Sequence, residues 1–464
     1  MAAELPQEIL SIIAAYSAAD DQKLAQFALV NRAWQAAFKG NIYSMLSVLS
    51  PSQNTEIVVR DDLRFSKRGL TLEQLACATG GPQSRCIARK KAIRRVIYKV
   101  AVPHWLNNER VKEDGYSYDN FMRRENDEAF CKGVPPLFEV LSSWNDKDYP
   151  IILSIVLQAE RVYTSDQSGE PLTRSYSAIE PLITAYRASL PSDCHLATTT
   201  CVASLDFPKA WTPAGMGSEN GISPSAALKI SAACGGDELL YIRIPGDYKI
   251  PPHDAACETQ KRNSTANNVH LLPTSVHRLD IDWTWLDAHE DSVRTTPPTF
   301  ALQPDAFSAN LHTASLQLHE LHTVDLHLLP DFFRCSPSCS HHWPNLEVLE
   351  LLLIPYNIFG VDLQYDHEVT GEPMLANDYF DSLYESVGHA ARQMHKNKHL
   401  ILSFGNEEDV LEFVTRRGRW EFATESRNGY SPSPKVLQAW KADAGNQDTN
   451  AEGFFAAEYE SWPP

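Results

Sequence analysis

The first fifty residues carry apolar side chains at helical spacing. Pro6 suits the first turn of a helix, where its missing N–H needs no partner, and an apolar stripe follows it. The stripe consists of Ile9, Ile12, Ile13 and Tyr16, with Leu10 on its flank. After the break SAADD comes a second apolar run, and Asn31 can cap a third helix whose pattern continues through Leu49. The pattern predicts three short helices within residues 1–49.

These helices carry more apolar surface than they can bury among themselves. A unit of about fifty residues buries only about 60% of the surface of its unfolded chain. The remaining apolar surface must pack against the rest of the chain or against a partner molecule, and the spacing alone leaves both interpretations open.

From about residue 70 onward, helical patterns alternate with short β-rich runs. Three such pairs are SAIEPLITAYRASL before VASLDF, SPSAALKISAACGG before ELLYIRI, and FDSLYESVGHAARQMH before HLILSF. In the last of these helices, a buried face is predicted for Phe380, Leu383, Val387, Ala390 and Met394. Recurring helix–strand units predict an α/β body built as a stack or a repeat, and the polar stretch 50–69 before it is typical of a linker.

The spacing of a leucine-rich repeat, apolar at positions 1, 4 and 6, fits six segments of this body. They are Ile152/Ile155/Leu157, Val202/Leu205/Phe207, Leu239/Ile242/Ile244, Val276/Leu279/Ile281, Leu321/Val324/Leu326 and Leu346/Leu349/Leu351. With 43% hydrophobic residues, roughly 37 such matches arise by chance, so the spacing alone proves no repeat. Only WPNLEVLELLL has strict leucines, and the units lie about 25 to about 50 residues apart. We expect any solenoid here to be irregular.

Composition narrows the classes of partner. The chain has 464 residues, and its 41 Lys and Arg against 59 Asp and Glu give a net charge of −18. A field this negative disfavours nucleic acid and anionic membranes, so protein partners are expected. The apolar runs are shorter than the roughly 20 residues of a membrane span, and the N-terminus lacks the pattern of a secretory signal. With nine scattered cysteines expected to be free thiols, we predict an intracellular protein, cytoplasmic, nuclear or both.

Candidate chemistry is sparse. The segment CSPSCSHH places Cys335, Cys339 and His341 close together in the chain, as zinc ligands are, but it lacks a second ligand pair at finger-like distance, so a polar loop is the competing interpretation. The basic run Arg89–Arg95 is either a nuclear localisation signal or a solvated face. His312, His319, His322 and His327 alternate with leucines and are mostly expected on a solvated strand face or at strand ends.

Catalytic motifs are not found. The sequence contains no GxSxG, Walker, GxGxxG or HExxH pattern. Asp193, Cys194 and His195 are neighbours in the chain, but a Cys–His catalytic pair is assembled in space, and chain neighbours rarely form one. We therefore expect no enzyme and no cofactor.

The N-terminal segment resembles the F-box, in LPQEILSIIAAY followed by KLAQFALVNRAWQAAF and IYSML. The family pattern is Leu-Pro, an acidic residue, paired aliphatics, and leucines leading to Leu-Val-x-Arg/Lys-x-Trp. The resemblance covers residues 4–49 and implies a three-helix module that docks on the Skp-type adaptor of a cullin-RING ubiquitin ligase. The positions it assigns to adaptor contact, or to the core of the module, are Leu5, Pro6, Ile9, Leu10, Ile13, Leu24, Leu29, Val30 and Trp34.

The rest of the chain is similar to the degenerate leucine-rich-repeat bodies of fungal F-box proteins, in FEVLSSW, VHRLDIDW, LHTVDLHLL and WPNLEVLELLL. The expected fold is α/β: an F-box at 1–49, a linker at 50–69, an irregular leucine-rich-repeat-like solenoid at 70–440 and a polar acidic tail at 441–464. The resemblance implies a substrate receptor of an SCF-type ligase that reaches cullin and RING subunits through the adaptor and leaves its protein substrate unknown. The alternatives are an F-box scaffold or localisation protein acting outside ubiquitination and, more weakly, a metal-binding protein.

Overall fold

We describe the protein from a computed structural model. It describes residues 6–19, 27, 29–51, 69–104, 117–144, 149–161, 187–208, 221–235, 237–244, 255–283, 305–324, 326, 328–334, 343–353, 364–366, 373–375, 377–404, 409–416, 419–426, 430–441 and 454–459. Within these ranges, none of the helices combines the length and the hydropathy needed to cross a bilayer.

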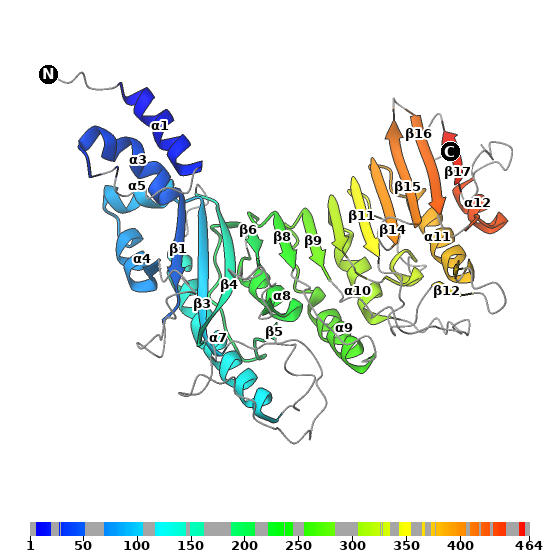
Figure 1. Cartoon of the computed structure of the whole chain (residues 1–464), viewed down its shortest axis with the longest axis horizontal. Coiled ribbons are helices and arrows are strands. Elements are labelled where there is room, and N and C mark those ends of the chain that lie inside the picture. The colour runs from blue at the N-terminus through cyan, green and yellow to red at the C-terminus, as the bar shows by residue number, and fades with distance from the viewer. Residues whose placement is uncertain are drawn as a thin grey trace.

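The described residues form one large sheet with helices against it (Figure 1). The helices are α1 (Gln7–Ala19), α3 (Arg32–Ser44), α4 (Leu72–Thr79), α5 (Ser84–Ala92), α7 (Ser117–Ser142), α8 (Pro224–Ala233), α9 (Ala255–Val269), α10 (Ala306–Ser315), α11 (Asn377–Ala391) and α12 (Pro434–Trp440), with a 3-10 turn η1 (Pro330–Phe332). The strands of the sheet are β1 (Met45–Leu49), β2 (Leu70–Thr71), β3 (Arg95–His104), β4 (Ile151–Arg161), β6 (Val202–Asp206), β8 (Tyr241–Ile244), β9 (Arg278–Asp282), β10 (Glu320–Val324), β11 (Val348–Leu353), β14 (His399–Phe404), β15 (Asp409–Arg416), β16 (Arg419–Ser426) and β17 (Phe454–Tyr459). Two small pairs lie apart from it: β5 (Arg187–Ala188) with β7 (Gly221–Ile222), and β12 (Gln364–Asp366) with β13 (Pro373–Leu375).

The strands of the sheet follow one another almost in chain order. From β1 to β14 each strand lies parallel to the next, and β15, β16 and β17 extend the sheet as antiparallel strands. Helices separate most of the parallel strands in sequence, as the crossover connections of parallel strands commonly do. The sequence prediction of an α/β fold is therefore confirmed at this level.

A turn before each strand keeps the middle of the sheet in register. The carbonyl of Leu240 accepts hydrogen bonds from the N–H groups of His277 and Arg278, at 2.9 and 3.0 Å. The carbonyls of His277, His319 and Glu347 each accept two N–H groups from the next strand in the same way. Equivalent residues of β8, β9, β10, β11 and β14 consequently lie side by side across the sheet.

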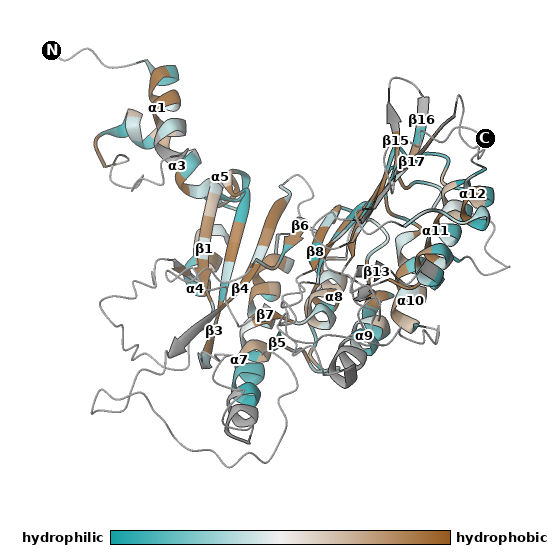
Figure 2. Cartoon of the chain, turned by 45° about the vertical axis from the view of Figure 1, so that its right-hand side comes forward, coloured by the Kyte–Doolittle hydropathy of each residue, from teal (hydrophilic) through white to brown (hydrophobic). Residues whose placement is uncertain are grey.

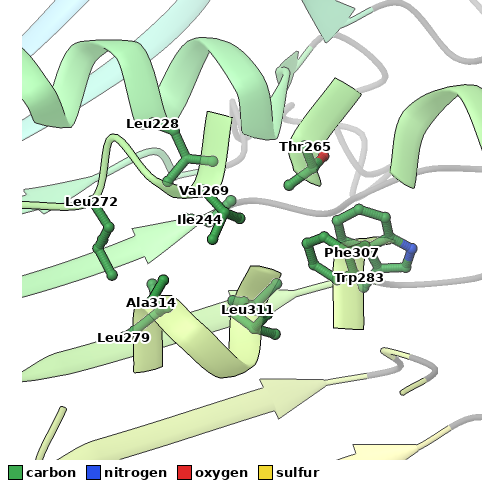
Figure 3. Close-up of a pocket in the computed structure, with 11 residues that line it drawn as sticks. Leu228, Ile244, Thr265, Val269, Leu272, Leu279, Trp283, Phe307, Leu311 and Ala314 are labelled. Atoms are coloured by element: carbon green, nitrogen blue, oxygen red, sulfur yellow. The ribbon is translucent and has the colours of Figure 1, made fainter. Parts of the chain in front are cut away.

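Helices cover one face of the sheet and build the core with it. Side chains that point toward the helices alternate along each strand with outward ones, as in Leu349, Leu351 and Leu353 of β11. Between α8, α9, α10 and the sheet, Trp283 stacks on Phe307 with ring centroids 5.4 Å apart, among the residues drawn in Figure 3. The space left between these side chains is about 10 Å³, which is at the lower limit for one water molecule, so this layer is packed core.

The predicted leucine-rich spacing holds in part. All three apolar positions are buried in the segments beginning at Val202, Leu239, Val276 and Leu346. Of the set predicted for β10, Leu321 and Leu326 are buried, but Val324 points outward. Leu321 pairs with Leu279 and Leu349, so the equivalent set is Leu318, Leu321 and Thr323, and the prediction lies three residues too late. In β4 Ile152 also points outward, since strand side chains alternate and its neighbours Ile151 and Leu153 are buried.

Two predicted boundaries are wrong. Residues 45–49 do not continue the third helix but form β1, which pairs with β3 and so belongs to the sheet. Their alternating burial shows that the apolar period is two, which the short run Met45–Leu49 left ambiguous. The predicted polar tail 441–464 contains β17, whose apolar residues pair with β16. Most of the predicted linker 50–69 and of the helix SAIEPLITAYRASL lies outside the described residues.

Candidate functional site

Two surfaces expose apolar side chains, and the first lies on the N-terminal helices. Helix α1 packs on α3 through Leu10 and Ala14, which are 2% and 0% exposed. Figure 2 shows α1 as largely hydrophobic, and its other side faces solvent with Ile12 53% and Tyr16 74% exposed. Because one helix face suffices to hold α1 on α3, the second apolar face is left uncovered.

The segment before α3 exposes two more large apolar side chains. Leu29 and Val30 are exposed, directly before the N-cap Asn31, whose side chain accepts a hydrogen bond from the N–H of Trp34 at 3.0 Å. Trp34, Phe27 and Phe38 form a cluster of three rings, with the centroid of Trp34 6.1 Å from that of Phe27 and 5.4 Å from that of Phe38. We name Ile9, Ile12, Tyr16, Leu29 and Val30 the N-terminal apolar surface.

The structure divides the predicted adaptor residues into groups. Pro6, Ile9, Leu29 and Val30 are exposed, Ile13 and Trp34 are half-buried, and Leu10 is buried in the helix pair; Leu5 and Leu24 lie outside the described residues. Ile12 and Tyr16 are exposed on the same face but were missing from the predicted set. Their place in the apolar stripe of the sequence was the available signal.

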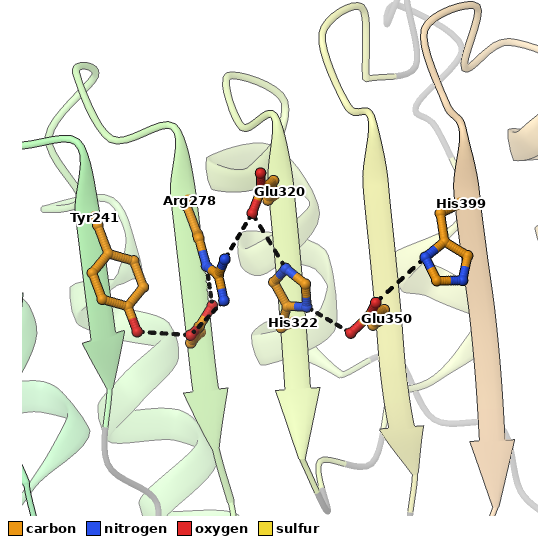
Figure 4. A network of polar contacts seen from close by, with 7 residues as sticks. Tyr241, Arg278, Glu320, His322, Glu350 and His399 are labelled. Atoms are coloured by element: carbon orange, nitrogen blue, oxygen red, sulfur yellow. Dashed lines mark hydrogen bonds and ion pairs between the residues drawn. The ribbon is translucent and has the colours of Figure 1, made fainter.

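The second surface is the face of the sheet that the described helices leave uncovered, which we name the open face (Figure 4). It consists of the outward side chains of β1, β3, β4, β6, β8, β9, β10, β11 and β14. Met45 and Ile152 are exposed on it, and farther along the sheet Val324 and Leu352, each 38% exposed, are register partners on β10 and β11. The exposed part of these apolar side chains gains nothing from burial in the isolated chain.

A series of polar contacts crosses the open face from β8 to β14 (Figure 4). The Tyr241 hydroxyl donates to Asp280 Oδ2 at 2.7 Å, and Arg278 binds Asp280 and Glu320, with a shortest N–O distance of 3.0 Å to each. On the next strand, His322 lies between the carboxylates of Glu320 and Glu350.

On β10, β11 and β14 these polar contacts join histidines to glutamates. His322 Nε2 lies 3.5 Å from Glu320 Oε2, and His322 Nδ1 lies 2.8 Å from Glu350 Oε2. The other oxygen of Glu350 lies 3.4 Å from His399 Nδ1. One carboxylate is thus shared by imidazoles from the strands on both sides, so Glu350 joins β10, β11 and β14 on this part of the face.

The opposite half of the open face carries more cations. Arg95 of β3 lies 3.6 Å from Asp206 of β6 and donates to the Ser154 hydroxyl at 3.0 Å, and Arg243 of β8 lies 3.5 Å from Asp282 of β9. Burial raises the pKa of Asp206, although Arg243 and Arg95 oppose this shift. Partly exposed pairs of this kind contribute about 0–1 kcal/mol each, so they fix side-chain positions more than they stabilise the fold.

The structure also places the cysteine and histidine that the sequence singled out. Burial raises the pKa of the Cys194 thiol to about 12, which keeps it protonated and a poor nucleophile, and His195 beside it is exposed. No group of three or more His, Cys, Asp or Glu in the described part of the chain could hold a metal ion, and Cys335, Cys339 and His341 lie outside that part.

Two other sequence predictions are resolved differently. His312, expected on a solvated strand face, is buried in α10, where Asp305 caps the helix and the ring packs edge-on against Trp343. His319 and His322 do lie at a strand start and on the open face. The basic run 89–95 spans the end of α5 and the start of β3, where the Arg89 guanidinium lies 5.9 Å from the ring centre of Tyr43.

Comparisons of the chain with protein families, with curated proteins and with solved structures found no match.

Proposed function

We propose that this chain is the substrate-recognition subunit of an SCF-type cullin-RING ubiquitin ligase. The N-terminal apolar surface binds a Skp-type adaptor, and through it the cullin and RING subunits. The open face of an irregular leucine-rich-repeat-like solenoid binds a protein substrate. The chemistry of ubiquitin transfer belongs to the partners, and this chain supplies proximity between substrate lysines and the charged enzyme.

One observation supports this division of labour above all. Of the eleven exposed large apolar side chains among the described residues, five form the N-terminal apolar surface and four lie on the open face. Surfaces that expose large apolar side chains are candidate protein-interaction sites, and two separate surfaces suit a protein that joins two partners. The F-box resemblance of residues 4–49 supports the adaptor as the first partner, and the consecutive parallel strands support a solenoid that presents a broad face to the second.

Co-purification with a Skp-type adaptor tests the proposal. We expect the wild-type chain to retain the adaptor and an Ile9→Ala/Ile12→Ala/Leu29→Ala variant to lose it, with at least a tenfold drop in affinity, because three exposed contacts of about 1 kcal/mol or more are removed. Ile87→Ala is the matched control, because Ile87 is exposed on α5, outside both surfaces. Failure of the wild-type chain to retain the adaptor overturns the proposal.

A reconstituted complex separates the proposal from a scaffold that acts outside ubiquitination. The receptor function requires ubiquitin transfer to a captured protein that depends on the N-terminal apolar surface. Adaptor binding without any such transfer favours the scaffold.

A further inference from the structure

The charges of the open face are not evenly distributed. On β3, β6 and β8 its outward side chains include three cations, Arg95, Lys99 and Arg243, and one carboxylate, Asp206. On β9, β10 and β11 they include one cation, Arg278, and four carboxylates: Asp280, Asp282, Glu320 and Glu350. The face is therefore basic toward the N-terminal strands and acidic toward the C-terminal ones.

The exposed apolar pair lies within the acidic half. Val324 is the register partner of Asp282 on one side and of Leu352 on the other, so a carboxylate borders the pair in its own row. Two residues earlier on the same strands, His322 and Glu350 form the next row. A partner that covers Val324 and Leu352 must accordingly place its own polar groups beside these carboxylates.

Strand geometry sets the size of such a partner. Neighbouring strands lie about 4.8 Å apart, so the three steps from β9 to β14 span roughly 14 Å, and an extended segment that crosses them needs only about five residues. In an extended segment successive side chains point to opposite sides, and alternate residues therefore reach the face. Short segments of this kind contact the apolar pair and the carboxylates at the same time.

We propose that the acidic half of the open face binds an extended, basic segment of the substrate, in which Lys or Arg side chains accompany aliphatic ones. The aliphatic side chains cover Val324 and Leu352, and the cations reach Asp282, Glu320 and Glu350. Each carboxylate has lone pairs beyond those used within the sheet, so it accepts a further donor without losing its present partner. This inference rests on the proposed function, since it names the substrate class of the receptor.

Peptide binding to the full-length chain tests the inference. The probes are three labelled ten-residue peptides with identical valine and leucine positions and with lysine, serine or glutamate at the remaining ones, measured by fluorescence anisotropy at pH 7.5 and low salt. We expect the lysine peptide to bind at least tenfold more tightly than the serine peptide and the glutamate peptide to bind most weakly, because opposite charges attract across the interface.

Two variants of equal net charge distinguish binding to the acidic half from a general effect of the chain's net charge. The affinity for the lysine peptide should fall about tenfold in Glu320→Gln/Glu350→Gln. The control Glu73→Gln/Glu139→Gln removes two exposed carboxylates from α4 and α7 and should change this affinity by less than about twofold. Circular dichroism verifies that both variants fold. A lysine peptide that binds no better than the serine peptide, or that loses affinity equally in both variants, overturns the inference.

Adaptor retention, measured on the same preparations, distinguishes the two proposals. If the adaptor binds and the peptides are not discriminated, the basic-substrate inference fails and the receptor proposal stands. If the lysine peptide binds through Glu320 and Glu350 but the adaptor is not retained, the ligase proposal fails and the binding surface stands.

Discussion

At the scale of single residues, His312 makes the stability of the fold depend on pH. Its ring lies 4.7 Å from that of Trp343, and its Nδ1 bonds the carbonyl of Phe332 at 2.7 Å. Burial lowers the pKa of His312 below its ordinary value of 6.5. As the pH falls through about 6.5, the unfolded chain takes up a proton that the folded chain resists, so the free energy of unfolding decreases.

We expect the contribution of His312 to be fully present above pH 6.5 and to be lost as the pH falls below it toward the depressed folded value. Urea unfolding at pH 7.5, 6.5 and 5.5 measures it. His312→Gln should reduce the acid loss of stability by on the order of 1 kcal/mol, while the exposed His277→Gln should keep the wild-type slope. If the free energy of unfolding varies with pH in the same way in all three proteins, His312 does not cause the acid loss of stability.

Leu10 and Ile12 separate the two roles of helix α1. Leu10→Ala should destabilise the α1–α3 pair by about 2–4 kcal/mol, because it leaves a cavity in a buried contact, whereas the exposed Ile12→Ala should change stability by less than about 0.5 kcal/mol. Amide hydrogen exchange of α1 and α3 measures the difference. Under the proposed function, Ile12→Ala weakens adaptor binding and leaves amide hydrogen exchange in α1 and α3 unchanged. Fast exchange in Ile12→Ala would show that this side chain belongs to the core.

Sequence reasoning worked for residues whose surroundings are set within one element. The five predicted core positions of α11, Phe380, Leu383, Val387, Ala390 and Met394, are all buried, because helical spacing alone puts them on one face. It could not decide which of Ile9 and Leu10 is buried, since that depends on where α3 packs. It also misplaced His312, because the alternation of histidine with leucine resembles a strand while the cap at Asp305 begins a helix.

At the scale of elements, Gly388 determines how α11 and α12 pack. The Trp440 indole lies over this glycine, stacks on Phe422 with ring centroids 4.3 Å apart and donates from Nε1 to the Tyr384 carbonyl at 3.0 Å. A Cβ at position 388 would lie 2.7 Å from the indole Cδ1. The close approach of the two helices therefore requires glycine at this position.

Gly388→Ala should lower the free energy of unfolding by about 1–3 kcal/mol, because the clash displaces a buried indole. Gly40→Ala in α3 is the matched control, since a Cβ there meets nothing within 4 Å and alanine favours the helix by roughly 0.5–1 kcal/mol. Thermal unfolding should show a lower midpoint for the first variant and an unchanged or higher one for the second. Equal midpoints would mean that Trp440 moves away without cost.

The sequence also predicted which helix–strand pairs recur, but it missed β17 at one edge of the sheet and β1 near the other. α8 with β8 and α11 with β14 appear where the pattern placed them. β1 and β17 are short apolar runs of five and six residues, and for runs of that length the pairing partner decides the structure. The partners, β3 and β16, are set by long-range contacts that no local spacing records.

At the scale of the whole molecule, the open face exists because strands far apart in the chain lie in one register. Tyr241 and His399 are separated by more than 150 residues, yet five neighbouring strands carry them and the groups between them. The sequence held every one of these polar residues, but a slip of one residue turns a strand side chain to the opposite face. The site therefore could not be predicted before the register was known.

That register predicts how binding of the basic peptide responds to cations introduced beside Glu350. Imidazoles from the two neighbouring strands contact this carboxylate, so a His322→Lys/His399→Lys variant places ammonium groups against its oxygens. We expect the affinity for the lysine peptide to fall at least fivefold in this variant, since the introduced lysines compete with those of the peptide for the same oxygens.

A His322→Gln/His399→Gln variant is the matched control and should bind the lysine peptide with nearly the wild-type affinity, because glutamine retains hydrogen bonding and adds no charge. The serine peptide should bind both variants alike, since it carries no cation to displace. If the lysine variant binds the lysine peptide as tightly as the wild type does, the introduced cations do not compete with the peptide. The shared carboxylate of Glu350 then does not control what the face binds.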